Sequence, residues 1–119
     1  MTDRLVAAQT ALSAGRRDEA IEHLIAAVNE DPARSIQVYR ALVTQLYNAQ
    51  RWAEGEVFAT QGLQRHPRDF DLLNIKGVLL RKLKRQPEAV VFLEQAVKIS
   101  PKQISAQQNL GNVLLDLNE

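Results

Sequence analysis

The sequence contains no cysteine, and this absence excludes disulfide bonds, thiolate metal sites and cysteine nucleophiles together. Aromatic residues make up only 5% of the chain, which argues against the stacking surfaces that bind single-stranded nucleic acid. No apolar stretch approaches the roughly 20 residues needed to cross a membrane, and the N-terminus lacks the pattern of a signal peptide. We therefore predict a soluble, cytoplasmic protein that binds neither nucleic acid nor membranes.

A strong charge of either sign is also missing. The 119 residues carry 15 lysines and arginines against 14 acids, a net charge of +1, so the overall charge gives no reason to expect binding to nucleic acid or to an anionic membrane. Hydrophobic residues make up 45% of the chain and charged residues 24%, which are ordinary values for a folded protein. This length and composition predict one domain with a core of its own.

Proline is scarce, but its placement is regular. Three of the four prolines, Pro32, Pro67 and Pro101, lie 35 and then 34 residues apart. A fixed period of this size indicates a repeat fold, and small residues recur in the same register. The positions twelve and five residues before each proline hold only alanine or glycine: Ala20, Gly55 and Ala89, then Ala27, Gly62 and Ala96.

Each period predicts two helices. Apolar residues such as Leu42, Leu46 and Ala49 follow a helical spacing, and a short polar turn divides each period. Asp18 is a predicted N-cap after the first turn, and Pro87 suits the first position of a helix. No strand pattern competes with seven predicted helices at about residues 3–14, 18–30, 36–49, 53–65, 69–83, 87–99 and 103–117.

These units resemble tetratricopeptide repeats (TPRs), whose 34-residue helix–turn–helix period and small-residue and proline landmarks they share. The phrase NLGN at 109–112 matches the first helix of the family, and DEAIEHL at 18–24 matches the second. The best-matching unit carries the landmarks Gly77, Leu80, Ala89, Leu93, Ala96 and Pro101. The resemblance divides a single domain, 1–119, into repeats at about 1–34, 36–69 and 70–103 and a solitary helix at 104–119.

The resemblance implies an all-α fold, a right-handed superhelical stack of antiparallel hairpins with about seven helices. First helices would line a concave groove, and second helices would form the convex side. The second unit departs from the family pattern, since Gly55, Ala59 and Gly62 stand where larger residues are usual, and we expect looser packing there. Ser35 is the predicted cap of the helix that follows the lengthened first loop.

The implied groove predicts a non-enzymatic module that binds a peptide or a segment of a partner protein. Amide and guanidinium donors dominate its lining, so we expect an acidic or polar ligand; the alternative is that these are only exposed side chains on a scaffold. The predicted binding residues are Gln9, Arg40, Thr44, Tyr47, Asn48, Asn74, Val78, Arg81, Lys82, Gln108 and Asn112.

One binding mode of the family is not matched. Repeats that grip the C-terminal carboxylate of chaperone tails use two lysines, two asparagines and an arginine on these helices. The corresponding positions here are Leu5, Gln9, Ala41, Asp71 and Ile75. Because the cations are missing, the resemblance implies that this grip is absent.

No catalytic residue, metal site or cofactor is predicted. Glu19, Glu22 and His23 share one helix face, but a solvated face with acids near the helix N-terminus explains them better than metal binding does. No nucleophile–base order and no glycine-rich phosphate loop occurs. The basic run at 81–85 closes a helix, where cations are favourable, and its functional alternative is contact with an acidic or phosphorylated partner.

Two alternative functions remain open at this stage. The chain could be the N-terminal recruiting segment of a larger enzyme, such as a transferase, that is cut at residue 119. It could also be a three-repeat chaperone of the secretion type, which would hold an unfolded segment in its groove.

The last glycine of the sequence, Gly111, repeats Gly77 one period later. We expect Gly77 to lie against the small-residue face around Ala89, whereas the helix that should pack on Gly111 would begin near residue 121. An incompletely covered apolar face is then expected on the last helix, formed by Leu110, Leu114 and Leu117. A longer repeat array, a partner or self-association with a second copy would cover it.

Overall fold

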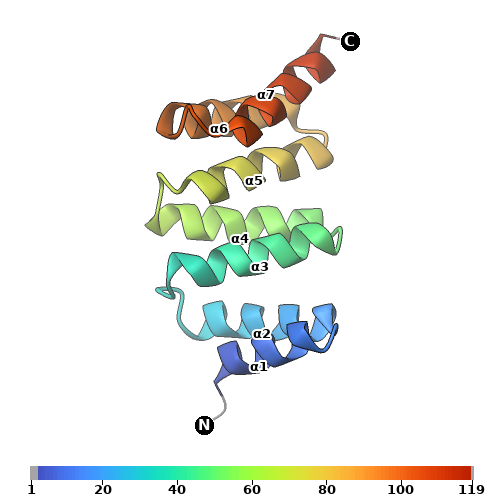
Figure 1. Cartoon of the computed structure of the whole chain (residues 1–119), viewed down its shortest axis with the longest axis vertical. Coiled ribbons are helices and arrows are strands. Elements are labelled where there is room, and N and C mark those ends of the chain that lie inside the picture. Colours follow the sequence, from blue (N-terminus) through green and yellow to red (C-terminus); the bar gives the residue numbers. More distant parts are fainter. Residues whose placement is uncertain (1–2, 119) are drawn as a thin grey trace.

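Every period of the sequence becomes a pair of antiparallel helices in the computed structural model, which describes residues 3–118. The helices are α1 (Arg4–Ser13), α2 (Arg17–Glu30), α3 (Ile36–Asn48), α4 (Trp52–Arg65), α5 (Phe70–Lys82), α6 (Gln86–Ile99) and α7 (Ile104–Leu117). Three hairpins, α1–α2, α3–α4 and α5–α6, stack in chain order, and α7 forms the last layer of a body that measures 51 × 24 × 22 Å (Figure 1). That part of the chain contains no strand.

The helix N-termini differ from the prediction in two places. Arg16 occupies the N-cap position of α2, so Asp18 lies in the first turn of the helix instead of capping it. Ser35 precedes α3 as predicted, but its side chain makes no capping hydrogen bond. Side-chain caps are formed by Asp3 and Asp69, whose carboxylates accept hydrogen bonds from backbone N–H groups at the start of α1 and α5.

Each hairpin turns through one residue in the left-handed backbone region. These residues are Gly15, Gln50 and Lys84, with φ values of 75°, 62° and 64°. A residue with a Cβ atom is strained in this conformation and glycine is not. The second and third turns therefore keep a polar side chain at a position that favours glycine.

Glycine allows the two helices of the third hairpin to approach closely. A Cβ atom added to Gly77 of α5 would lie 2.4 Å from Cγ of Leu93, so the leucine of α6 fills the space of the missing side chain. The close approach expected at Gly77 is therefore present, and the nearest atoms belong to Leu93, which lies in the same buried cluster as Ala89.

The same arrangement joins the second hairpin to the third. A Cβ atom at Gly55 would lie 3.2 Å from the methyl groups of Leu79, and one at Gly62 would lie 2.7 Å from a methyl group of Leu72. Both glycines are buried, and leucines of α5 occupy the space above them. The expectation of looser packing in the second unit is therefore wrong.

The stack curves toward its first helices. In the described part of the chain, Cα atoms of α3 come within 8 Å of those of α5, and Cα atoms of α5 within 8 Å of those of α7, whereas the backbones of α2 and α4, and of α4 and α6, stay farther apart. Neighbouring first helices are therefore closer together than neighbouring second helices, which makes α3, α5 and α7 the inner side of the curve. α1 lies beyond this continuous inner side, because it contacts α2 but not α3.

Lys76 of α5 is the one charged residue of the core among residues 3–118. Its Nζ donates to Oγ1 of Thr60 at 2.7 Å, lies 3.6 Å from a carboxylate oxygen of Glu56 and sits 4.2 Å from the ring centre of Phe92. A buried ammonium group is tolerated only with such partners. The contacts of Lys76 are thus those of a structural residue that joins α5 to α4 and α6.

The apolar face of α7 is only partly covered. Leu114 and Leu117 are 46% and 47% exposed, and a Cβ atom added to Gly111 would meet no atom within 4 Å. Leu110 was expected on this open face, but it packs against the buried cluster around Leu80 instead. The face of α7 that repeats the Gly77 face of α5 has no helix packed on it within residues 3–118.

Gly77 and Gly111 therefore predict opposite effects of the same substitution. Gly77→Ala should lower the free energy of unfolding by about 1–2 kcal/mol, because the added methyl group overpacks the contact with Leu93. Gly111→Ala should raise it by about 1 kcal/mol, because alanine favours the helix and meets no neighbour. Chemical denaturation followed by circular dichroism measures both, and a shift of both variants in the same direction would contradict this packing.

Candidate protein-binding surface

Arg40 links α3 to the beginning of α5. Its guanidinium donates to both carboxylate oxygens of Asp69, with Nε 3.2 Å from Oδ2, and Nε also lies 3.5 Å from a carboxylate oxygen of Asp71. Asp69 caps α5 as well, accepting a hydrogen bond from the backbone N–H of Leu72 at 2.9 Å. The predicted binding residue Arg40 thus serves the stacking of two hairpins.

Two further links join α5 to α7. Nδ2 of Asn74 donates to Oγ of Ser105 at 3.2 Å, and Oδ1 of Asn74 accepts from Nδ2 of Asn109 at 2.9 Å. At the other end of the helices, Arg81 donates to the carboxylate of Asp116 from Nε at 2.6 Å and from Nη2 at 3.0 Å. Polar contacts therefore join α3 to the beginning of α5, and α5 to α7 near both ends.

These ion pairs lower the pKa values of the acids that take part in them. Burial disfavours the charged form of Asp69, but the hydrogen bonds from Arg40 and from the backbone of Leu72 outweigh burial and hold the pKa of this carboxyl below its usual value. The hydrogen bonds from Arg81 lower the pKa of Asp116, and Gln86 adds to this effect. Both acids stay charged at neutral pH, which maintains the links.

The other predicted binding residues are available to a ligand to different degrees. Gln9 lies on α1, outside the continuous inner side, and its side chain donates to Ser13. Tyr47 and Val78 are half-buried on the inner side. The fully exposed members of the predicted set are Gln9, Thr44, Asn48, Lys82, Gln108 and Asn112.

An aromatic pair lies at the turn end of the inner side. The rings of Tyr47 and Trp52 have centroids 5.3 Å apart, and Nζ of Lys82 lies 5.4 Å from the ring centre of Trp52. Trp52, the single tryptophan of the chain, was not among the predicted binding residues. Its position five residues after Tyr47, across a turn, is the signal that could have identified the pair.

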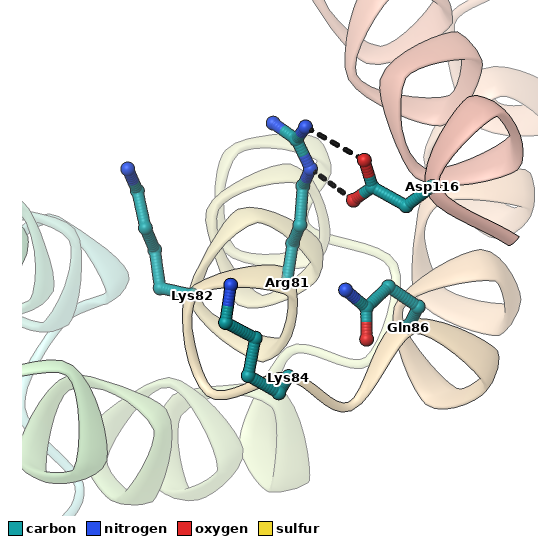
Figure 2. A pocket seen from close by; sticks show the side chains of 5 residues that line it. All are labelled: Arg81, Lys82, Lys84, Gln86 and Asp116. Carbon is teal, nitrogen blue, oxygen red and sulfur yellow. Dashed lines mark hydrogen bonds and ion pairs between the residues drawn. The ribbon is translucent and has the colours of Figure 1, made fainter. Parts of the chain in front are cut away.

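A hollow of about 430 Å³ lies at the end of α5 and shares Lys82 with this aromatic pair (Figure 2). Arg81 points across it to Asp116, while the side chains of Lys82 and Lys84 lie on the other side of Arg81 (Figure 2). Gln86, the first residue of α6, completes the lining. We call the residues of this region, Tyr47, Trp52, Arg81, Lys82 and Lys84, the basic–aromatic corner.

Most arginines near the hairpin turns are already paired. Arg85 contacts Glu88 of its own hairpin at 2.7 Å and Glu56 of the preceding one at 3.4 Å. Arg51 pairs with Glu54 at 2.7 Å and lies 3.6 Å from Glu22. By contrast, no carboxylate of residues 3–118 lies within 4.0 Å of the ammonium groups of Lys82 or Lys84.

The acids considered for a metal site have other partners. Glu19 pairs with Arg16 at 3.1 Å, and Glu22 lies near Arg51. No group of three histidines or acids suited to a metal ion occurs among the residues that the structure describes. None of the helices in that part of the chain is long and apolar enough to span a membrane.

The family model of the tetratricopeptide repeat matches residues 41–104, more than half of the chain. The chain belongs to the tetratricopeptide repeat family. It is 30% identical over 105 residues, 88% of its length, to a TPR repeat-containing protein of Pseudomonas aeruginosa, of which it spans 18%. TPR domains are generally non-enzymatic interaction modules.

Solved TPR structures confirm the predicted all-α stack of hairpins. The first TPR of Spaghetti (RPAP3), bound to the HSP90 peptide SRMEEVD, matches 98% of this chain and 94% of its own with a TM-score of 0.87 and 17% identity. MamA matches 97% of this chain and 67% of its own with a TM-score of 0.86 and 19% identity. The second TPR domain of human RPAP3, in complex with the HSP70 peptide SGPTIEEVD, covers 93% and 92% with a TM-score of 0.83 and 17% identity.

The Arg40–Asp69 contact predicts a defined dependence of stability on pH. Asp69→Asn keeps a capping side chain but removes the charge, so the free energy of unfolding should fall by about 1–2 kcal/mol at neutral pH. Because the pKa of Asp69 is lowered by folding, this contribution is present above the pKa of the unfolded carboxyl, about 4, and is lost as the pH falls through the lower pKa of the folded state. Urea denaturation from neutral pH down to about pH 2 should therefore show the two proteins converging, and a constant difference would contradict the assignment.

Proposed function

We propose that this chain is a non-enzymatic protein-binding module, which holds a segment of a partner protein against the inner side of α3, α5 and α7. The observation that carries the proposal is the basic–aromatic corner, which offers an aromatic pair and two lysines that have no carboxylate within 4.0 Å among residues 3–118. Two structurally similar TPR domains are described in complex with peptides, which supports a peptide-binding role for the fold.

The inner side suits an extended, polar segment. Thr44, Asn48 and Asn112 are exposed there and can exchange hydrogen bonds with a peptide backbone, while Val78 provides a small apolar contact. Lys82 adds a positive charge that favours acidic side chains in the ligand. Arg40, Asn74 and Arg81 hold this surface in place through their contacts with neighbouring helices.

The proposed ligand differs from the C-terminal tails of chaperones. The positions that would grip a terminal carboxylate include Leu5, Ala41 and Ile75, which carry no charge, and Asp71, whose side chain is 62% exposed and negative. A negative side chain there repels a carboxylate group. We therefore propose an internal or differently anchored segment, although the fold resembles that of the HSP90-peptide complex.

Two contexts for this binding role follow from the sequence. The module could recruit substrates for an enzyme domain of the same polypeptide, or act as a secretion-type chaperone for an unfolded segment. Both contexts leave the inner side as the surface that contacts the ligand. Self-association is a separate proposal, because the exposed Leu114 and Leu117 lie on α7 at the end of the stack.

Site-specific photo-crosslinking tests the proposed surface. A photoreactive amino acid replaces Thr44 or Asn112 on the inner side or, as the control, Val91, which is exposed on the second helix α6. In extracts of the source cells, both inner positions should give a covalent product with the same partner, and position 91 should not. An equal yield from position 91, or products from that position alone, would overturn the proposal.

A further inference from the structure

We propose that the basic–aromatic corner binds an acidic segment of the partner, in which two carboxylate side chains flank an apolar or aromatic residue. This inference rests on the proposed function, since it specifies which side chains of the ligand bind at one end of the inner side. The corner is built by three elements: Tyr47 of α3, Trp52 of α4, and Arg81, Lys82 and Lys84 at the end of α5 and in the turn that follows it.

Charge complementarity is the first argument. Three cationic side chains and one carboxylate, that of Asp116, line the hollow. This carboxylate already accepts two hydrogen bonds from Arg81. Within residues 3–118 no carboxylate lies within 4.0 Å of Lys82 or Lys84, whereas Arg51 and Arg85 at the hairpin turns are paired with acids. The charge of Lys84 acts on Asp116, which already pairs with Arg81. Two carboxylates of a ligand would balance this local excess of positive charge.

The orientation of Arg81 is the second argument. Its pair with Asp116 uses Nε and Nη2, so Nη1 is left to donate to an oxygen atom of the ligand. The two bonds also fix the plane of the guanidinium, so a ligand carboxylate would meet a donor that is already oriented (Figure 2). Asp116 is thus a positioning residue for Arg81.

The third argument is the aromatic pair, which favours a protein segment over nucleic acid as the ligand. The ammonium group of Lys82 lies over the ring of Trp52, and a carboxylate that attracts Lys82 would leave this ring open to an apolar side chain of the ligand. Nucleic acid would require a longer basic surface and more stacking residues than a single pair in a chain with a net charge of +1.

The fluorescence of the single tryptophan provides a direct readout, because Trp52 is part of the corner. The whole chain is titrated with the probe peptide Gly-Glu-Glu-Asp-Phe-Glu-Glu-Asp-Gly. The reference peptide has Gln and Asn in place of each Glu and Asp. We expect a saturable change of Trp52 emission with the acidic peptide only, and a weaker affinity as salt concentration rises.

Two double variants of equal charge test the location. Lys82→Gln/Lys84→Gln removes the corner cations, and Lys98→Gln/Lys102→Gln removes two exposed lysines elsewhere. The first should weaken peptide binding about tenfold or more, for two lost charge-assisted contacts, and the second by less than about twofold. Glutamine is compatible with the left-handed turn position of Lys84, because Gln50 occupies the equivalent position of the preceding hairpin.

Several results would overturn the assignment. Equal weakening by both double variants would show that binding follows net charge alone. Equal binding of the reference peptide would show that the corner does not distinguish acidic from neutral side chains. Tighter binding of a thymidine oligonucleotide would favour nucleic acid as the ligand. If the corner fails in these tests while crosslinks from position 44 persist, the proposed function stands and only the acidic preference is wrong; loss of both would reject the function itself.

Discussion

Leucine side chains that occupy the space above glycines hold the layers of this structure together. Leu93 lies on Gly77 within a hairpin, and Leu72 lies on Gly62 between two hairpins. Because glycine has no Cβ atom, a side chain of the neighbouring helix can approach the helix backbone there more closely than at any other residue. This close contact fixes both the spacing and the rotation of the helices. The repeated small residues are therefore the structural basis of the stack.

This packing separates the two roles of the first helices. Their buried faces carry core leucines and Gly77, and their inner faces carry the polar contacts Arg40–Asp69, Asn74–Ser105 and Arg81–Asp116. These contacts already use donors of Arg40, Asn74 and Arg81, whereas Lys82 at the turn end of α5 remains available to a partner. The basic–aromatic corner is thus a consequence of how the hairpins are linked.

The periodic part of the sequence was sufficient to predict the fold. Helical spacing and the proline period located seven helices, because the same sequence pattern, which follows from the same packing, occurs in each repeat. The acids that neutralise the predicted binding residues could not be found in this way, since Asp69 and Asp116 lie 29 and 35 residues from their arginines and the helical spacing does not pair residues across repeats. Leu110 was misplaced for a related reason, because a helical spacing does not say which of two neighbouring helices covers a residue.

A double-mutant cycle between Gly62 and Leu72 tests most directly whether this contact organises the stack. Gly62→Ala introduces a methyl group 2.7 Å from Leu72 and 3.1 Å from Cβ of Tyr39, and Leu72→Ala removes the closer of these two contacts. Each single variant should lower the free energy of unfolding, and the double variant should lose less than the sum by about 1 kcal/mol or more. Additive losses, within about 0.5 kcal/mol, would contradict the account, because they would show that the glycine and the leucine act independently.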